Sequence, residues 1–193
     1  MVIDLLSKFN FLDFIILIIF FRICYIAAKV GLSVEIFKFL GVLFSTYISL
    51  HYYTAFSDLL KRRFLPKEMP LEFMDFVTFS VIIIVVYLFF VVLRSLLFRF
   101  VQLNAIPRIN QIAGFILGIG RGFLVIGLLT FALGISSVDY LRNAVKYSYL
   151  GSKAVVIAPQ TYNWFWGNIF SKFSTKENYN STVTEAMERF GHK

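Results

Sequence analysis

Arg121 is the residue of this chain whose type and setting point most directly to function. It lies near the middle of an apolar stretch, 111–135, that is long enough to span a membrane. A charged side chain at the centre of a bilayer costs about 2.5–3.5 kcal/mol on insertion scales, so it must face protein, water or the lipid headgroups. Arg121 therefore marks a place where a carboxylate or another anion can bind.

Glycines accompany Arg121 at a spacing that matters for packing. Gly114, Gly118 and Gly122 recur every fourth residue, so on a helix they share one stripe. A stripe without side chains lets a neighbouring backbone approach closely. We expect these three glycines to form a helix-packing face, and Gly31 and Gly41 in the N-terminal half to pack in the same way.

Three further ionisable residues complete the candidate intramembrane polar site. They are Arg22, Asp13 and Glu35, which lie within or beside the predicted N-terminal spans. Glu35 and Lys38 are three residues apart and can pair on one helix face. Two arginines and two carboxylates leave two alternatives open, because Arg121 and Arg22 are either neutralised inside the protein or available to an anion.

The residues predict no catalytic site, no metal site and no cofactor. His51 and His192 are the only histidines, they are not at ligand spacing from each other, and Cys24 is the only cysteine. The sequence also lacks the Gly-x-Ser-x-Gly motif of serine hydrolases. We therefore expect a protein that is not an enzyme.

Composition indicates an integral membrane protein. The 193 residues are 59% hydrophobic, include 24 Phe and have a mean hydropathy of +0.76, which is more apolar surface than a soluble domain of this size can bury. The formal charge of +8 comes largely from basic residues near the ends of apolar segments. Such residues orient a chain in the lipid bilayer, so we expect no nucleic acid partner.

The elements that position the polar residues are predicted to be membrane-spanning helices. The fold class is all-α, a polytopic protein with a four-helix membrane domain over residues 1–136. The predicted spans are about 11–28, 34–53, 76–98 and 111–135. Pro66 and Pro70 interrupt the charged loop between the second and third spans, and Pro107 precedes the fourth.

Two C-terminal segments follow the spans. Residues 137–170 are predicted to be an amphipathic, interfacial helical segment, because its apolar runs are too short to cross a bilayer and its tryptophans suit the headgroup region. The apolar residues at helical spacing are Val138, Leu141, Val145 and Tyr149. Residues 171–193 are polar and are predicted to be a disordered tail.

An even number of spans places both termini on one side of the membrane. Of the 19 Lys and Arg residues, 12 lie near the termini or in the loop between the second and third spans. The positive-inside rule predicts that both termini and this loop are cytoplasmic, with the connections near Gly31 and Asn104 on the other side.

The order of the motifs resembles the colicin V production protein (CvpA) family. The first half of that pattern is Asp13, Lys29-Val30-Gly31, Glu35 and Gly41. The second half is Asn110, Gly114, Gly118, Arg121 and Gly122, so the resemblance covers about residues 11–135. Val30 separates the basic residue from Gly31, whereas the family usually has the two adjacent.

The resemblance implies a multi-pass protein of the bacterial inner membrane, required for colicin V production or export and for envelope homeostasis, with no established enzymatic activity. Two functions are compatible with it. In the first, the protein is a membrane scaffold or assembly factor whose glycine face packs against its own copies, as a homo-oligomer, or against other envelope membrane proteins. In the second, it is a small transporter or channel subunit in which Arg121 lines a path for an anionic solute or lipid headgroup.

Overall fold

Four long helices dominate the structure. A computed structural model describes residues 9–64, 70–97, 107–173 and 177–190, and within these ranges it contains helices and no strand. The helices long and apolar enough to cross a membrane are α2 (Phe11–Val30), α3 (Leu32–Phe64), α4 (Leu71–Leu97) and α5 (Pro107–Ile135). The predicted all-α fold with four spans is confirmed.

Local signals set the helix ends. Asn10 caps α2, because its side chain accepts from the backbone N–H groups of Leu12 and Asp13 while the Asp13 carboxylate accepts from Asn10 N. Gly31 ends α2 with a φ of +82°, a backbone conformation that glycine adopts without strain. Pro107 occupies the first position of α5, where its missing N–H costs nothing.

Two predicted boundaries are wrong. The second span, predicted to end near residue 53, belongs to a helix that continues to Phe64, and α4 already begins at Leu71 rather than near residue 76. No proline interrupts α3 before Pro66, and the basic residues of its last turn interact favourably with the helix dipole. Pro66 and the predicted connection near Asn104 lie outside the described residues.

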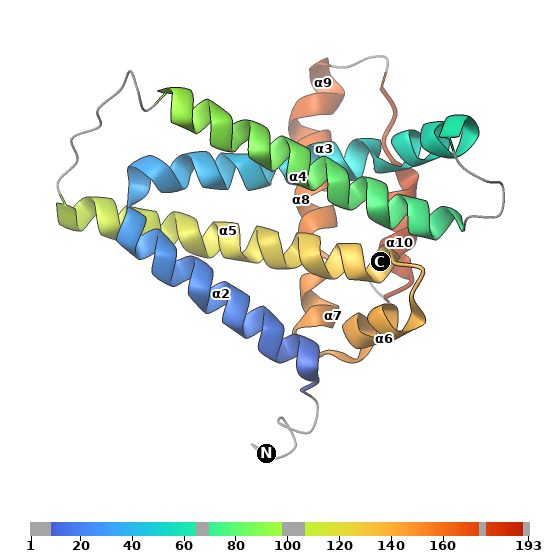
Figure 1. The fold of residues 1–193 in the computed structure, drawn as a ribbon, viewed down its shortest axis with the longest axis horizontal. Coiled ribbons are helices and arrows are strands. Elements are labelled where there is room, and N and C mark those ends of the chain that lie inside the picture. Colours follow the sequence, from blue (N-terminus) through green and yellow to red (C-terminus); the bar gives the residue numbers. More distant parts are fainter. Residues whose placement is uncertain (1–8, 65–69, 98–106, 174–176, 191–193) are drawn as a thin grey trace.

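The four spans are arranged in the order α4, α3, α5, α2, with α3 and α5 in the middle (Figure 1). The terminal side of the bundle is where α2 and α4 begin and α3 and α5 end, and the far side is the opposite end. Helix α3 makes extensive contacts with both α4 and α5, and α2 makes extensive contacts with α5, whereas α2 and α4 scarcely meet. Helices α2 and α4 therefore lie apart, on either side of the two central helices.

The segment after α5 folds into short helices that begin on the terminal side and then cross the bundle (Figure 1). These are α6 (Asp139–Tyr147), α7 (Gly151–Ala154), α8 (Ile157–Phe165), η1 (Trp166–Phe170) and α9 (Ser171–Phe173). Figure 1 shows α8 running steeply across α3 and α5, which it contacts. Val145, Val155 and Tyr162 are fully buried, so one face of this segment packs on the bundle.

The C-terminal tail is not disordered over residues 177–190. Ser181–Glu188 form helix α10, in which Val183, Ala186 and Met187 are buried. These residues follow the i, i+3, i+4 spacing of a docked helix face. The prediction failed because the tail is polar on average, whereas the apolar residues of α10 all lie on the side that meets the bundle.

Candidate functional site

The glycine stripe of α5 packs against α2 of the same chain. A β-carbon on Gly118 would overlap the β-carbon of Ala27, and one on Gly114 would lie 2.7–2.8 Å from the backbone of Gly31. A β-carbon on Gly122 would lie 2.8 Å from the ring of Phe20. Close approach at three successive turns holds α2 directly on α5, so the stripe is occupied within the molecule.

Two glycines of the N-terminal half have different neighbours. Gly31 lies beside the Asn110 side chain, whose oxygen accepts from the Ser33 backbone N–H at 3.4 Å. Gly41 faces α4, where an added β-carbon would lie 3.0 Å from that of Phe90. The first glycine therefore serves the α2–α5 contact and the second serves the α3–α4 contact.

Arg121 meets Glu35 inside the bundle. Its Nε lies 2.5 Å from Glu35 Oε1, and the carboxylate is completely buried while Arg121 is 8% exposed. The contact is an ion pair and not an aligned hydrogen bond, because neither atom satisfies hydrogen-bond geometry with the other. Lys38 Nζ lies 3.8 Å from the second carboxylate oxygen, as the i, i+3 spacing predicts.

Glu35 is the only carboxylate available to the cations of the far side. Residues 14–57 contain no other Asp or Glu, and residues 76–138 contain none. Arg22 is exposed on α2 and makes no ion pair among the described residues. Arg121, Lys38 and Arg22 thus outnumber the carboxylate by three to one, which leaves a local excess of positive charge.

Two cavities meet at Arg121. The smaller, of about 340 Å³, is lined by three cations, Arg22, Lys38 and Arg121, together with Tyr87 and three isoleucines. The larger, of about 470 Å³, is lined mostly by aliphatic side chains of all four spans, with Ser45, Ser80 and Arg121 among its polar residues. Ile84 on its wall is 57% exposed, so this cavity opens toward the surroundings of the bundle.

Asp13 lies at a separate place, on the terminal side. Its Oδ1 accepts from the Ser148 hydroxyl at 2.5 Å and from the Leu150 backbone N–H at 2.6 Å. Asn10 supports this contact, because its side-chain NH₂ donates to the Ala144 carbonyl at 2.7 Å. Asp13 therefore fixes the turn between α6 and α7 to the start of α2, and the predicted grouping with Arg121 is wrong.

A series of buried hydrogen bonds connects the C-terminal tail to α3. The Asn180 backbone N–H donates to Tyr162 Oη at 3.1 Å, and Tyr162 Oη lies 2.9 Å from His51 Nδ1. Burial raises the pKa of Tyr162 to about 12, so its hydroxyl stays protonated. On the other edge of the ring, His51 Nε2 lies 3.3 Å from Glu177 Oε2.

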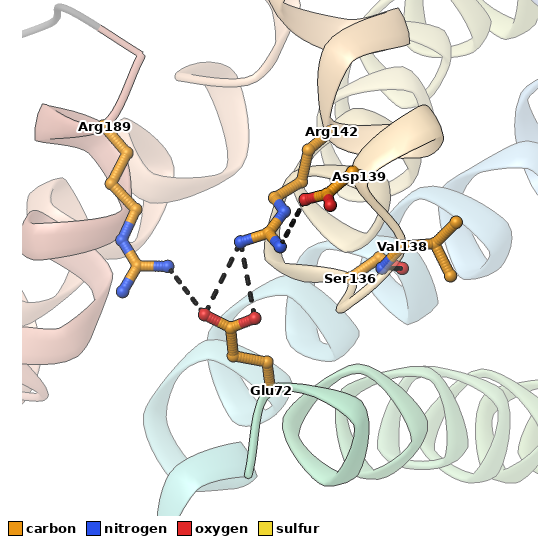
Figure 2. A network of polar contacts seen from close by, with 6 residues as sticks. All are labelled: Glu72, Ser136, Val138, Asp139, Arg142 and Arg189. Atoms are coloured by element: carbon orange, nitrogen blue, oxygen red, sulfur yellow. Dashed lines mark hydrogen bonds and ion pairs between the residues drawn. The ribbon is translucent and has the colours of Figure 1, made fainter. Parts of the chain in front are cut away.

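A second polar network joins α4 to the C-terminal helices. Glu72 lies 3.3 Å from Arg142 Nη1 and 3.4 Å from Arg189 Nη1, and Arg142 also contacts Asp139 at 2.9 Å (Figure 2). These side chains are largely exposed, so each pair contributes little on its own, about 0–1 kcal/mol. Their arrangement shows that α6 and α10 converge on the first turn of α4.

Sequence reasoning missed several residues of the site. Tyr87, Ser45 and Ser80 come from stretches that read simply as apolar spans, so only the packing of α4 against α3 reveals that they line the Arg121 cavity. The contacts of Asp13 were also missed, because Ser148 is 135 residues away and lies in a segment without a recognisable motif.

The arrangement can hold an anion more readily than it can perform catalysis. Among the described residues no group of three or more His, Cys, Asp or Glu is placed to hold a metal ion. The polar side chains that line the two cavities are cations and hydroxyls, which bind negative charge, and Glu35 is the one carboxylate beside them.

A family comparison identifies most of the described chain. The family model described as "Colicin V production protein" matches residues 12–159, which includes all four spans, the Glu35–Arg121 pair and the turn held by Asp13. This family is not known as an enzyme family. No curated protein and no solved structure shows significant similarity to the chain. The chain is a multi-pass membrane protein and belongs to the colicin V production protein family.

Proposed function

We propose that the protein is a non-enzymatic scaffold or assembly factor of the bacterial inner membrane, needed for colicin V production or export and for envelope homeostasis. The observation that carries this proposal is the attachment of the C-terminal helices to one end of the bundle by the buried carboxylate of Asp13. A scaffold must present a surface in a fixed position. A buried carboxylate that accepts several hydrogen bonds supplies that rigidity.

The C-terminal helices offer such a surface. Tyr140 and Tyr147 on α6 are 66% and 70% exposed, and Trp164 on α8 is 58% exposed. Exposed aromatic side chains are common where a protein meets a partner or the headgroup region. The glycine stripe is already filled by α2, so a partner or a second copy must bind elsewhere, and this surface is the one we propose.

The orientation proposed for the chain is cytoplasmic for both termini. By sequence position, 12 of the 19 Lys and Arg residues lie near the termini or between the second and third spans, against 7 elsewhere. In that orientation α6 faces the cytoplasm, where an exported peptide and its machinery first meet the membrane.

A photo-crosslinking experiment tests the scaffold function. A photoreactive amino acid at Tyr147, in a strain that depends on this chain for colicin V release, should give a discrete crosslink to a protein. The same residue at Val85 on α4, which is 60% exposed and faces outward, serves as the control. The crosslink and the release should both be lost in the Asp13→Asn variant. Normal release without any Tyr147 crosslink to protein would contradict the proposal.

A further inference from the structure

The cavities beside Arg121 together have the shape of a site for an amphiphile. The 340 Å³ cavity is cationic and the 470 Å³ cavity is mainly apolar, and both are bounded by Ile23, Tyr87 and Arg121. A molecule with a charged head and an apolar chain could therefore place one part in each. A small soluble anion would leave the apolar cavity unused.

The charges favour a negatively charged head. Arg22, Lys38 and Arg121 line the smaller cavity, and Glu35 supplies a single compensating charge. Arg121 and Lys38 share that carboxylate, whereas Arg22 has no ionic partner among the described residues. An anion bound between the three cations lowers the cost of holding them inside a membrane.

The larger cavity is accessible from the lipid. It lies between α2 and α4, which scarcely contact each other, and its wall includes Ile84, which is 57% exposed. Its lining is mostly Ile, Val, Leu and Ala, side chains that suit an acyl chain. A lipid can thus enter sideways without crossing the bundle.

We propose that this groove binds an anionic phospholipid, with the phosphodiester between Arg22, Lys38 and Arg121 and one acyl chain in the larger cavity. The proposal is independent of the scaffold function, because the groove and the surface formed by the C-terminal helices share no residue. A bound lipid would also fill the gap between α2 and α4.

Lipid titration of the purified full-length protein tests the site. Native mass spectrometry in detergent should show one tightly held phosphatidylglycerol, which phosphatidylcholine does not replace. Arg22→Gln and Lys38→Gln should each weaken this binding about fivefold, which corresponds to the loss of one cation. Arg108→Gln removes an exposed cation outside both cavities and should leave the affinity unchanged.

A second variant tests the chain cavity without changing charge. Ser80 is half-buried on its wall, so Ser80→Phe should fill the space and weaken phosphatidylglycerol binding by a similar factor. Equal affinities for the Arg22→Gln and Arg108→Gln variants would overturn the proposal. Complete displacement of the lipid by free glycerol phosphate would overturn it too, because the site would then recognise a soluble anion.

Discussion

The Glu35–Arg121 pair combines high burial with an incomplete set of hydrogen bonds. Removing two charges from water costs several kcal/mol, so a buried pair adds little net stability even at a separation of 2.5 Å. Removing one partner is a different matter, since it leaves the other charge buried and uncompensated. The pair is therefore a sensitive point of the fold even if its net contribution is small.

Glu35→Gln should destabilise the protein by about 3–5 kcal/mol, because Arg121 loses the carboxylate that compensates it. For a chain of this length, that loss corresponds to a fall of roughly 6–20 °C in the unfolding temperature. Thermal unfolding in detergent, followed by tryptophan fluorescence, measures the change. The double variant Glu35→Gln with Arg121→Gln should recover part of the loss. A Glu35→Gln variant with an unchanged unfolding temperature would show that lipid or water already compensates Arg121.

Asp13→Asn should loosen the C-terminal helices while the four spans stay inserted. An amide at this position presents an NH₂ group to donors such as Leu150 N–H, which then lose a charged acceptor. Trypsin should cut at Lys146 and Lys153 about tenfold faster than in the wild type, consistent with a loss of about 1.4 kcal/mol. Asp139→Asn is the matched control, because the Asp139 side chain is 87% exposed. Equal cleavage rates in the two variants would mean that Asp13 does not hold this turn.

At the scale of helices, the sequence predicted one side of the contact between α5 and α2 but not the other. The spacing of Gly114, Gly118 and Gly122 identifies the packing face of α5 from the sequence alone. It does not identify the partner, because α2 contributes ordinary residues such as Ala27 and Phe20 that could face lipid equally well. The expectation of an intermolecular contact followed from this missing information.

Replacing Gly118 should separate α2 from α5. Gly118→Ala brings its methyl group onto that of Ala27 and should cost about 1–3 kcal/mol, and Gly118→Leu should cost more. The purified yield and the unfolding temperature measure both. Ala27→Gly should rescue Gly118→Ala, whereas Gly167→Ala, at a glycine with open space around it, should change neither quantity. A fully stable Gly118→Leu protein would show that α2 does not lie on this stripe.

Helix α10 shows what composition cannot reveal. A helix of eight residues is unstable alone and takes its stability from docking. Its docking depends on long-range contacts such as Asn180 Nδ2 with the Leu50 carbonyl at 2.7 Å and Phe190 beside Gly134. The residues of this segment do not by themselves indicate those contacts, so its sequence is similar to that of a disordered tail.

For the whole molecule, hydropathy predicted the number and approximate place of the spans, since each needs an apolar run of nearly fixed length. It could not predict how the spans pack, and the Arg121 cavity exists only because α2 and α4 are placed apart. The distribution of charged residues in the sequence is limited as a predictor in a similar way. The termini and the connection between the second and third spans have more Lys and Arg, but residues 14–57 and 76–138 contain only Glu35 to offset their own cations.

Reporter fusions should place the termini and the end of α3 in the cytoplasm. Alkaline phosphatase joined after Arg63 should be inactive, because the enzyme matures only outside the cytoplasm, and the same reporter joined after Lys29 should be active. The prediction rests on the count of 12 basic residues near the termini or between the second and third spans against 7 elsewhere in the sequence. The reverse pattern of activity would place the aromatic surface of α6 and α8 in the periplasm.

The long-range hydrogen bonds of Asp13 also determine the order of events during synthesis and membrane insertion. The carboxylate leaves the ribosome early in synthesis, but its partner Ser148 follows 135 residues later. At about 5–20 residues per second, the interval is on the order of ten seconds. During that time α2 stands in the membrane with a carboxylate that lacks its Ser148 and Leu150 donors, and without the glycine face of α5. The newly made first helix should therefore stay close to the insertion machinery until nearly the whole chain has emerged.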